Sequence, residues 1–364
     1  MARYLLMAML LGVYSGTVHA KITADAVVDA AFRGGSAVSQ NVAPVFTTIT
    51  AALEAAPADQ ALPYRVFIKK GVYHEKLTVF RAGVNLSGES REETVISWGD
   101  SGSSRGPDGE ELGTAGSATL TVLAPDFRAQ NLTIENSFDY PANRALPEND
   151  PGRVEKMQAV TVRTTGDSDR AVFDSVTISG YQDTLFVDAG RHYFRNCRIL
   201  GHVDFIFGAG QAVFDDCEIV SRNRAGKNPT GYITAPSTRV GQPYGFLFTE
   251  SRLTREVADI PAASVRLGRP WHPNADPLAN GSAVFKSCYM DDHIGPEGFA
   301  PISGRGPDGE RIWFEVNDSS RFFEFGSHGP GAEGAEHRRL LTEEQAEWYT
   351  TRQVLNGWVP PQPD

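Results

Sequence analysis

The sequence VFDSVTI at residues 172–178 returns as YFRNCRI at 193–199 and again as VFDDCEI at 213–219. The second residue of every copy is a phenylalanine, and these phenylalanines follow one another at intervals of 21 and 20 residues. Self-similarity at a fixed period of this length is typical of a solenoid, in which each repeat forms one coil that stacks on the next. The short apolar runs in the repeats predict strands. We therefore predict an all-β solenoid of parallel strands with short flanking helices.

Two aspartates occupy the same position in successive repeats. GYQD at residues 180–183 and GHVD at 201–204 place Asp183 and Asp204 21 residues apart. Neighbouring strands of a sheet lie about 4.7–4.9 Å apart, so stacked coils should bring the two carboxyl groups together. Like charges at that distance raise one pKa and lower the other, which yields a proton donor and an anionic nucleophile from one residue type. The alternative is that both are turn residues, but apolar runs typical of strands follow each of them.

Three further polar residues lie close to these acids in the repeat pattern or in a later loop. Gln158 and Gln182 carry neutral amides, which could stabilise a developing oxyanion. Arg269, in the loop that contains LGRPW, could hold one aspartate ionised through a bidentate contact. The alternatives are glutamines exposed on the solenoid surface and a solvated loop arginine.

The chain has 364 residues, of which 41% are hydrophobic and 22% charged, and this composition fits a single large domain. We expect a helix within residues 46–57, with a threonine N-cap, and another across 342–355 that begins with a capping box. Two segments rich in Gly, Ser or Pro, at residues 99–116 and 136–156, interrupt the strand pattern. They are expected to be excursions from the coil, as binding loops or tolerated insertions.

Residues 1–20 have the three-part pattern of a secretory signal. Arg3 is followed by an apolar run and by the small-residue ending Val18-His19-Ala20, which predicts cleavage before Lys21. We therefore expect a mature domain of residues 21–364 that is exported, to the medium or as far as the periplasm. No cysteine follows the apolar run and no later stretch is long and apolar enough to span a bilayer, so no membrane anchor is expected.

The chain has three cysteines, and two of them, Cys197 and Cys217, share one position in successive repeats. Stacking would place their Cα atoms within the roughly 4.4–6.8 Å that a disulfide requires, and an exported protein meets an oxidising compartment. We therefore predict a Cys197–Cys217 disulfide. Cys288 has the same position in a later repeat and is expected to be buried and free.

Several kinds of partner are disfavoured. The net charge is −11 and no basic run is mixed with aromatic residues, so nucleic acid is not expected. The histidines show no spacing typical of a metal site, and neither a metal nor another cofactor is expected. An acidic protein repels a polyanion, which favours a neutral or partly neutralised polymer.

Taken with GVYHEK and QAV, the motifs GYQDTLFV, GHVDFIFG and LGRPW resemble the pectin methylesterases, and most of all their bacterial, secreted branch. The resemblance implies a right-handed parallel β-helix that hydrolyses the methyl esters of galacturonate units in pectin, releasing methanol and pectate. It also implies a monomer without a cofactor, whose partner is methylesterified homogalacturonan.

Carried over position by position, the resemblance makes Asp204 the nucleophile and Asp183 the general acid and then the general base. Gln158 and Gln182 become oxyanion-hole donors, and Arg269 the partner of Asp204. The residues implied to contact the sugar chain are Trp271, Phe207, Tyr181 and Thr114.

Other functions remain open from the residues alone. Two carboxyl groups about 5 Å apart also suit a retaining glycosidase, although a glycosidase has no acyl oxyanion for the glutamines to stabilise. A polysaccharide-binding solenoid without activity is another candidate. The resemblance itself adds a further one, an acyl thioesterase of the same fold. The loops after Trp271 and at residues 293–304, which the resemblance places beside the cleft, are short, and this leaves the preferred substrate pattern open.

Overall fold

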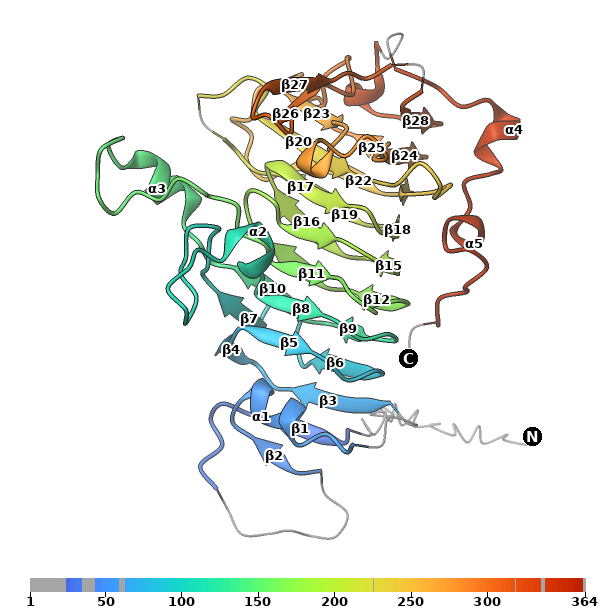
Figure 1. Cartoon of the computed structure of the whole chain (residues 1–364). Helices are drawn as coiled ribbons and strands as arrows, with labels where there is room; N and C mark the ends of the chain where they lie inside the picture. Colours follow the sequence, from blue (N-terminus) through green and yellow to red (C-terminus); the bar gives the residue numbers. More distant parts are fainter. Residues whose placement is uncertain are drawn as a thin grey trace, which may run out of the picture.

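The structure is a computed structural model that describes residues 24–34, 43–58, 63–224, 226–317, 319–334 and 338–362. The predicted signal segment lies outside the described residues. Within them, three parallel sheets stack around a common core (Figure 1). Each coil contributes one strand to each sheet, as β12, β13 and β14 do in succession. The predicted solenoid is confirmed as a parallel β-helix.

The strands of each sheet follow in their spatial order. The first sheet contains β2 (Val45–Phe46), β1 (Ala26–Val28), β3 (Tyr64–Ile68), β6 (Val84–Gly88), β9 (Arg128–Gln130), β12 (Ala171–Asp174), β15 (Arg191–Arg195), β18 (Gln211–Asp215), β21 (Phe246–Thr249), β24 (Ser282–Lys286) and β28 (Arg321–Phe325). The second contains β25 (Tyr289–Met290), β22 (Arg252–Arg255), β19 (Glu218–Ser221), β16 (Arg198–Gly201), β13 (Thr177–Ser179), β10 (Thr133–Asn136), β7 (Thr94–Trp98) and β4 (Gly71–His74). The third contains β23 (Val265–Gly268), β20 (Gly231–Pro236), β17 (Val203–Gly208), β14 (Leu185–Val187), β11 (Val162–Thr164), β8 (Leu120–Val122) and β5 (Leu77–Val79).

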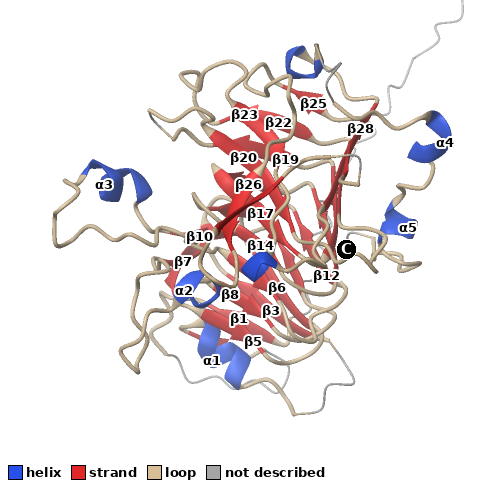
Figure 2. Cartoon of the chain, turned by 45° about the horizontal axis from the view of Figure 1, so that its top comes forward, coloured by secondary structure: helices blue, strands red, loops and turns tan. Residues whose placement is uncertain are grey.

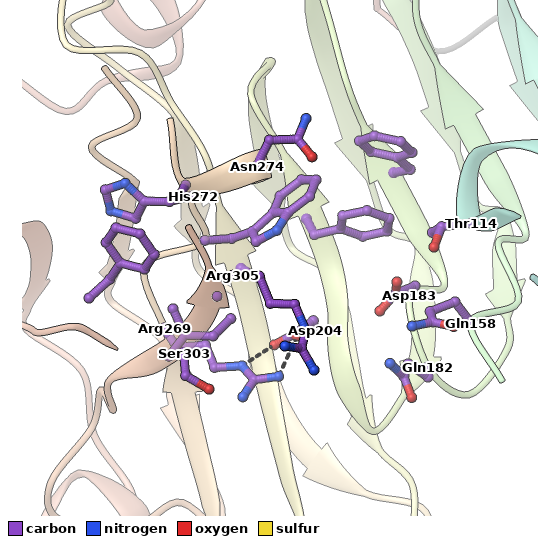
Figure 3. A pocket seen from close by; sticks show the side chains of 18 of the residues that line it. Thr114, Gln158, Gln182, Asp183, Asp204, Arg269, His272, Asn274, Ser303 and Arg305 are labelled. Carbon is purple, nitrogen blue, oxygen red and sulfur yellow. Dashed lines mark hydrogen bonds and ion pairs between the residues drawn. The ribbon is translucent and has the colours of Figure 1, made fainter. Parts of the chain in front are cut away.

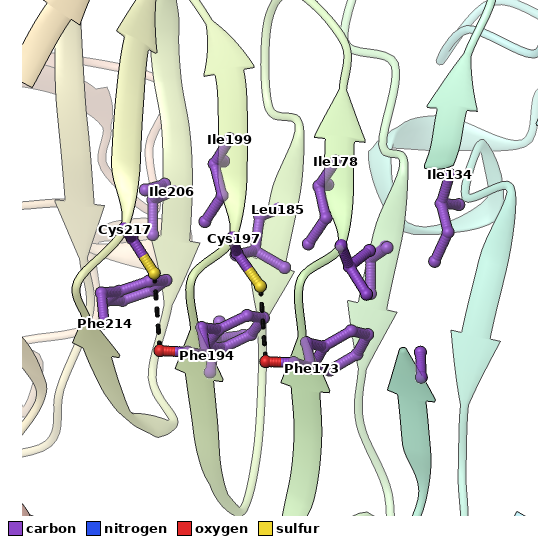
Figure 4. Packing of buried hydrophobic residues seen from close by; sticks show 14 of the residues in the cluster. Ile134, Phe173, Ile178, Leu185, Phe194, Cys197, Ile199, Ile206, Phe214 and Cys217 are labelled. Carbon is purple, nitrogen blue, oxygen red and sulfur yellow. Dashed lines mark hydrogen bonds between the residues drawn. The ribbon is translucent and has the colours of Figure 1, made fainter. Parts of the chain in front are cut away.

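The repeated phenylalanine forms a ladder through the core. Phe173 pairs with Phe194 and Phe194 with Phe214 in neighbouring strands, and their rings stack with centroids 4.8 Å apart (Figure 4). Phe248 and Phe285 continue the ladder at 4.5 Å spacing. Stacked aromatic rings bury large apolar areas and add specific ring contacts, so the repeat stabilises each coil against the next.

The cysteines depart from the prediction. The structure has Cys197 and Cys217 as buried free thiols, so the predicted disulfide is not formed in it. Each thiol instead donates to the carbonyl oxygen of the phenylalanine one coil earlier, Cys197 to Phe173 at 3.3 Å and Cys217 to Phe194 at 3.5 Å (Figure 4). The two sulfur atoms therefore point along the ladder in the same direction. Cys288 is buried and free, as expected.

Helices flank the solenoid. The first is α1 (Ile49–Glu54), where the Thr48 side chain accepts from the Ala51 amide as the predicted N-cap. The two excursions contain α2 (Gly113–Gly116) and α3 (Tyr140–Ala145), and α3 projects from the side of the solenoid (Figure 1). Two 3-10 turns complete the set, η1 (Pro273–Ala275) and η2 (Pro330–Ala332). None of the helices in the described part of the chain is long and apolar enough to cross a membrane.

The C-terminal segment forms two short helices rather than the single one predicted. The predicted capping box of Thr342 and Gln345 begins α4 (Glu343–Ala346), and Thr350 caps a second helix, α5 (Thr351–Val354). Thr350 has extended backbone angles, which interrupt the helical path between them. The segment packs its apolar side chains against the outer face of the first sheet.

Candidate active site

A cavity of about 500 Å³ lies on the outer face of the third sheet. Strands β14, β17 and β20 supply its floor, α2 lies at one side, and η1 lies at the other with an antiparallel hairpin of β26 (Ile302–Arg305) and β27 (Arg311–Phe314). Figure 2 shows β26 crossing in front of the sheet. All five residues predicted to be catalytic line this cavity, and Figure 3 shows them together: Asp183, Asp204, Gln158, Gln182 and Arg269.

The two aspartates share an unusual backbone conformation. Asp183 has φ of +62° and Asp204 has φ of +49°, in the left-handed region that few residues with a side chain adopt. Asp204 also lies where the pairing of β17 with β20 shifts register, between Val203 and Ile206. Such bulges redirect a side chain, and strained backbone of this kind gathers at functional sites. Both carboxyl groups line the cavity, while Phe205 stays fully buried in the core.

Arg269 donates two hydrogen bonds to the carboxylate of Asp204. Its Nε donates to Oδ1 at 2.7 Å and its Nη2 to Oδ2 at 2.6 Å, and the two side chains are only 19% and 15% exposed. The guanidinium also lies 4.1 Å from the centre of the Tyr232 ring, in a cation–π contact. A bidentate contact of this kind favours the ionised carboxylate and fixes its orientation.

The backbone around Arg269 allows this approach. Arg269 follows β23, and its amide donates to the carbonyl oxygen of Thr234 at 3.0 Å. A Cβ atom at Gly268 would lie 2.1 Å from Thr234 Oγ1, so glycine is required where β23 meets β20. This close packing places Arg269 beside Asp204, although 65 residues separate them in the sequence.

The surroundings of Asp183, unlike those of Asp204, disfavour the charged carboxylate. The residue is 9% exposed, and burial raises the pKa of its carboxyl well above the usual value, with a further rise from the charge of Asp204. Arg269 and the side chain of Gln182 lower the pKa by smaller amounts. The site therefore pairs a carboxylate bound to arginine with a carboxyl group whose pKa is raised by burial.

The two glutamines lie beside Asp183 (Figure 3). Gln158 stands just before β11, where its carbonyl oxygen accepts from the Gly102 amide at 2.7 Å. The carbonyl oxygen of Gln182 accepts from the Ala159 amide at 3.1 Å, which joins the two coils directly under the cavity. Both backbones are therefore held by hydrogen bonds while the amide side chains face the acids as neutral donors.

Aromatic rings line the cavity beside the acids. Phe207 and Trp271 lie with ring centroids 5.6 Å apart at 65°, and Phe186 stacks on Phe207 at 4.2 Å. Phe207 and Trp271 occupy the predicted position, as does Thr114, which reaches the cavity from α2. Phe186 was missed, although it precedes Phe207 by one repeat of 21 residues and pairs with it directly in the sheet.

Tyr181 does not line this cavity, and its contact with the sugar chain stays a prediction. Its ring stacks on Tyr140 from the α3 excursion at 5.7 Å, and the guanidinium of Arg222 lies 4.5 Å from its centre. His202 is buried in the same cluster, and burial lowers its pKa to about 3. His202 also lies outside the residues that line the cavity, so it is no candidate general base.

The hairpin that forms this wall was not predicted, although residues 293–304, where it begins, were expected beside the cleft. Phe314 of β27 stacks on His272 with centroids 3.8 Å apart, and this contact fastens the hairpin to the loop after Trp271. Ser303 and Arg305 of β26 line the cavity as well. The hairpin lies outside the repeat, so no periodic signal marks it. Among the described residues, no group of three His, Cys, Asp or Glu side chains is placed to hold a metal ion.

Comparisons with known proteins agree with this architecture. Residues 36–357 match the family model described as Pectinesterase. The chain is 45% identical over 329 residues to Pectinesterase A of Dickeya dadantii (strain 3937), covering 87% of this chain and 89% of that protein.

Two solved structures superpose closely on the fold. Pectin methylesterase PemA from Erwinia chrysanthemi is 44% identical with a TM-score of 0.88, and a pectin methylesterase in complex with a hexasaccharide is 45% identical with a TM-score of 0.87. Each alignment covers 94% of this chain and 100% of the other. The chain therefore belongs to the pectinesterase family of carboxylic ester hydrolases.

Proposed function

We propose that this pectin methylesterase works through a covalent acyl intermediate on Asp204, with Asp183 moving the protons. The observation that carries the proposal is the contrast between two neighbouring acids. Asp204 makes a bidentate contact with Arg269, whereas the pKa of Asp183 is raised by burial and by the charge of Asp204. One residue can then attack as an anion while the other donates a proton.

In the first half-reaction, an Asp204 oxygen attacks the carbonyl carbon of the methyl ester. Negative charge develops on the former carbonyl oxygen, and the amides of Gln158 and Gln182 are the neutral donors available to stabilise it. When the intermediate collapses, the bond to the methoxy group breaks and Asp183 donates its proton to the departing methanol. Asp204 is left as an acyl anhydride with galacturonate, and Asp183 as a carboxylate.

In the second half-reaction, the Asp183 carboxylate accepts a proton from water as the water oxygen attacks the galacturonate carbonyl carbon. The anhydride bond to Asp204 then breaks, which releases the free acid and restores the carboxylate held by Arg269. Asp183 ends the cycle protonated, as it began. No proton, electron or cofactor is needed beyond those that the ester, the water and the two acids supply.

The substrate that we propose is methylesterified homogalacturonan. Phe207, Trp271 and Phe186 offer aromatic faces for sugar rings, with Thr114 opposite them. A related pectin methylesterase has been solved with a hexasaccharide, which supports an oligosaccharide in this cleft. We further propose that residues 1–20 export a single domain, which acts as a monomer outside the cytoplasm.

A glycosidase reaction is the main rival, and one experiment separates the two. Methanol release and new reducing ends should both be measured on highly methylated pectin, with Asp204→Ala as the control variant. We expect methanol without new reducing ends, and no methanol from a variant that melts like the wild type. Asp204→Ala with activity within tenfold of the wild type would remove Asp204 from the mechanism. A rival thioesterase activity would appear instead as hydrolysis of acyl thioesters with pectin left intact.

A further inference from the structure

One buried side chain, that of Asn136, connects the two excursions from the solenoid to each other. Asn136 is the last residue of β10 and is 4% exposed. Its Nδ2 donates to the carbonyl oxygens of Asp100 and Val160, each at 2.9 Å. The same nitrogen donates to the carbonyl oxygen of Ser117 at 3.2 Å, and Oδ1 accepts from the Phe138 amide at 3.0 Å. One amide group therefore joins four separate backbone segments.

These contacts hold the ends of both loops at the sheet. Asp100 and Ser117 lie at the two ends of the excursion formed by residues 99–116, and Phe138 lies at the start of the other. The side-chain amide of asparagine offers N–H donors and one carbonyl acceptor, so it satisfies the backbone groups that it meets. A buried backbone group without a partner costs free energy. Asn136 therefore fixes where the two excursions leave the coil and return to it.

Val160, two residues after Gln158, is held from two directions. Its carbonyl oxygen accepts from Asn136, and its amide donates to the Ser117 hydroxyl at 3.0 Å. Ser117 is fully buried and is itself bonded to Asn136 through its carbonyl oxygen. The peptide groups on both sides of Val160 are thus tied to one buried cluster, and a single residue separates them from Gln158.

The first excursion also meets Gln158 from the other side. The Gly102 amide donates to the carbonyl oxygen of Gln158 at 2.7 Å, and a Cβ atom at Gly102 would lie 3.5 Å from Gln158 Oε1. The loop backbone therefore lies against the side-chain amide. The Ser117 hydroxyl donates to the carbonyl oxygen of Thr114 at 2.7 Å, and Thr114 and Gln158 line the same side of the cavity (Figure 3). A change at Asn136 would reach Gln158 along both of these routes.

We propose that Asn136 is a positioning residue for ester hydrolysis, which holds the side-chain amide of Gln158 where the oxyanion forms. The inference rests on the oxyanion role proposed for Gln158. A donor stabilises an oxyanion well only when its orientation is set before the reaction, and a misplacement of about 1 Å can lower a rate by about 10². Asn136 does not line the cavity, so it acts through Gln158 rather than on the substrate.

The test is a double-mutant cycle between Asn136 and Gln158, with methanol release from highly methylated pectin as the assay. Asn136→Ala should lower kcat about tenfold and leave KM unchanged, because a displaced amide stabilises the oxyanion less well. In a Gln158→Ala background the same substitution should lower kcat no further, because the donor that it positions is absent. Ser117→Ala removes the other anchor of Val160 and should show the same pattern, so this second cycle decides if Asn136→Ala does not fold.

Asn143→Ala is the matched control. Asn143 is a buried asparagine of the second excursion, and its side chain also bonds to backbone groups, with Nδ2 donating to the Val154 carbonyl oxygen at 3.0 Å and Oδ1 accepting from the Val154 amide at 2.9 Å. These bonds lie within the excursion. The variant should therefore unfold more easily than the wild type and keep the wild-type kcat.

Several results would overturn the inference. An equal loss of kcat from Asn136→Ala in the wild-type and Gln158→Ala backgrounds would show that Asn136 acts independently of Gln158. A wild-type kcat in Asn136→Ala, a rise in KM without a fall in kcat, or the same loss of kcat from Asn143→Ala would contradict it as well. Gln158→Ala alone tests the proposed oxyanion role separately, because a wild-type kcat in that variant would refute the role itself.

Discussion

Replacing Asp183 with asparagine should lower activity and raise stability in the same variant. The amide has nearly the same shape and can still donate a hydrogen bond, but it cannot deliver a proton to methanol. General acid–base catalysis contributes about 10²–10⁴ in rate, or ~2.7–5.4 kcal/mol, so we expect a loss of methanol release in that range. The alkaline limb of the pH–activity profile should also disappear, because it reports loss of the proton from Asp183.

The stability change follows from the direction of the pKa shift. Burial raises the pKa of folded Asp183 above the value of about 3.9 expected in an unfolded chain. The folded protein therefore binds this proton more tightly, and the free energy of unfolding falls as pH rises from about 4 through the raised pKa. Each unit of pKa difference costs about 1.4 kcal/mol once the pH exceeds the folded value. Asp183→Asn removes this cost.

Two assays check the reasoning. Methanol release across pH should show the lost alkaline limb, and urea unfolding at several pH values should show a smaller decline in stability for Asp183→Asn than for the wild type. Asp204→Ala serves as a control. It should also abolish activity, but it removes the charge of Asp204 and leaves the buried carboxyl of Asp183 in place. Full activity with an unchanged alkaline limb, or unfolding with the wild-type pH dependence, would refute the assignment of Asp183 as the buried acid.

Three further predictions concern the proposed oxyanion donors, the thiols and the core ladder. Gln158→Ala should reduce kcat by about 10²–10³ while KM changes little, because the amide acts on the intermediate; an equal rise in KM would instead indicate substrate binding. A thiol titration of the unreduced protein in denaturant should count three thiols, since Cys197, Cys217 and Cys288 are free in the structure. A count of one would show that Cys197 and Cys217 had formed the disulfide predicted from the repeat. Phe194→Ala should lower the free energy of unfolding by about 3–5 kcal/mol, because the fully buried ring stacks on two others, and a loss below about 1 kcal/mol in denaturant titration would contradict the ladder as a source of stability.

Much of the site could be predicted from the sequence, because in a solenoid a fixed spacing along the chain brings residues close together in space. Residues one repeat apart become neighbours in adjacent strands, so the 21-residue interval was enough to pair Asp183 with Asp204. The same interval would have identified Phe186 beside Phe207. Arg269 and Trp271 lie in a longer coil with no matching period, and they were assigned through the LGRPW motif and its family resemblance.

Other parts of the site required the folded chain. The β26–β27 hairpin folds back over the cavity through the contact of Phe314 with His272, and neither residue belongs to the repeat. Tyr181 was expected in the cleft but stacks on Tyr140, which the α3 excursion brings beside it. The C-terminal helix is divided at Thr350, where the segment follows the outer face of the first sheet.

The sequence by itself determined the coil, its aromatic ladder and the pairing of Asp183 with Asp204, because these depend only on a repeating distance along the chain. Tertiary structure alone decided the direction of each side chain. Asp183 and Asp204 reach the cavity through positive φ angles and, for Asp204, a shift in strand register. The period does not encode these torsions. It likewise could not show that the β26–β27 hairpin forms one wall of the cavity, because local sequence specifies a turn and only long-range packing specifies what the turn faces.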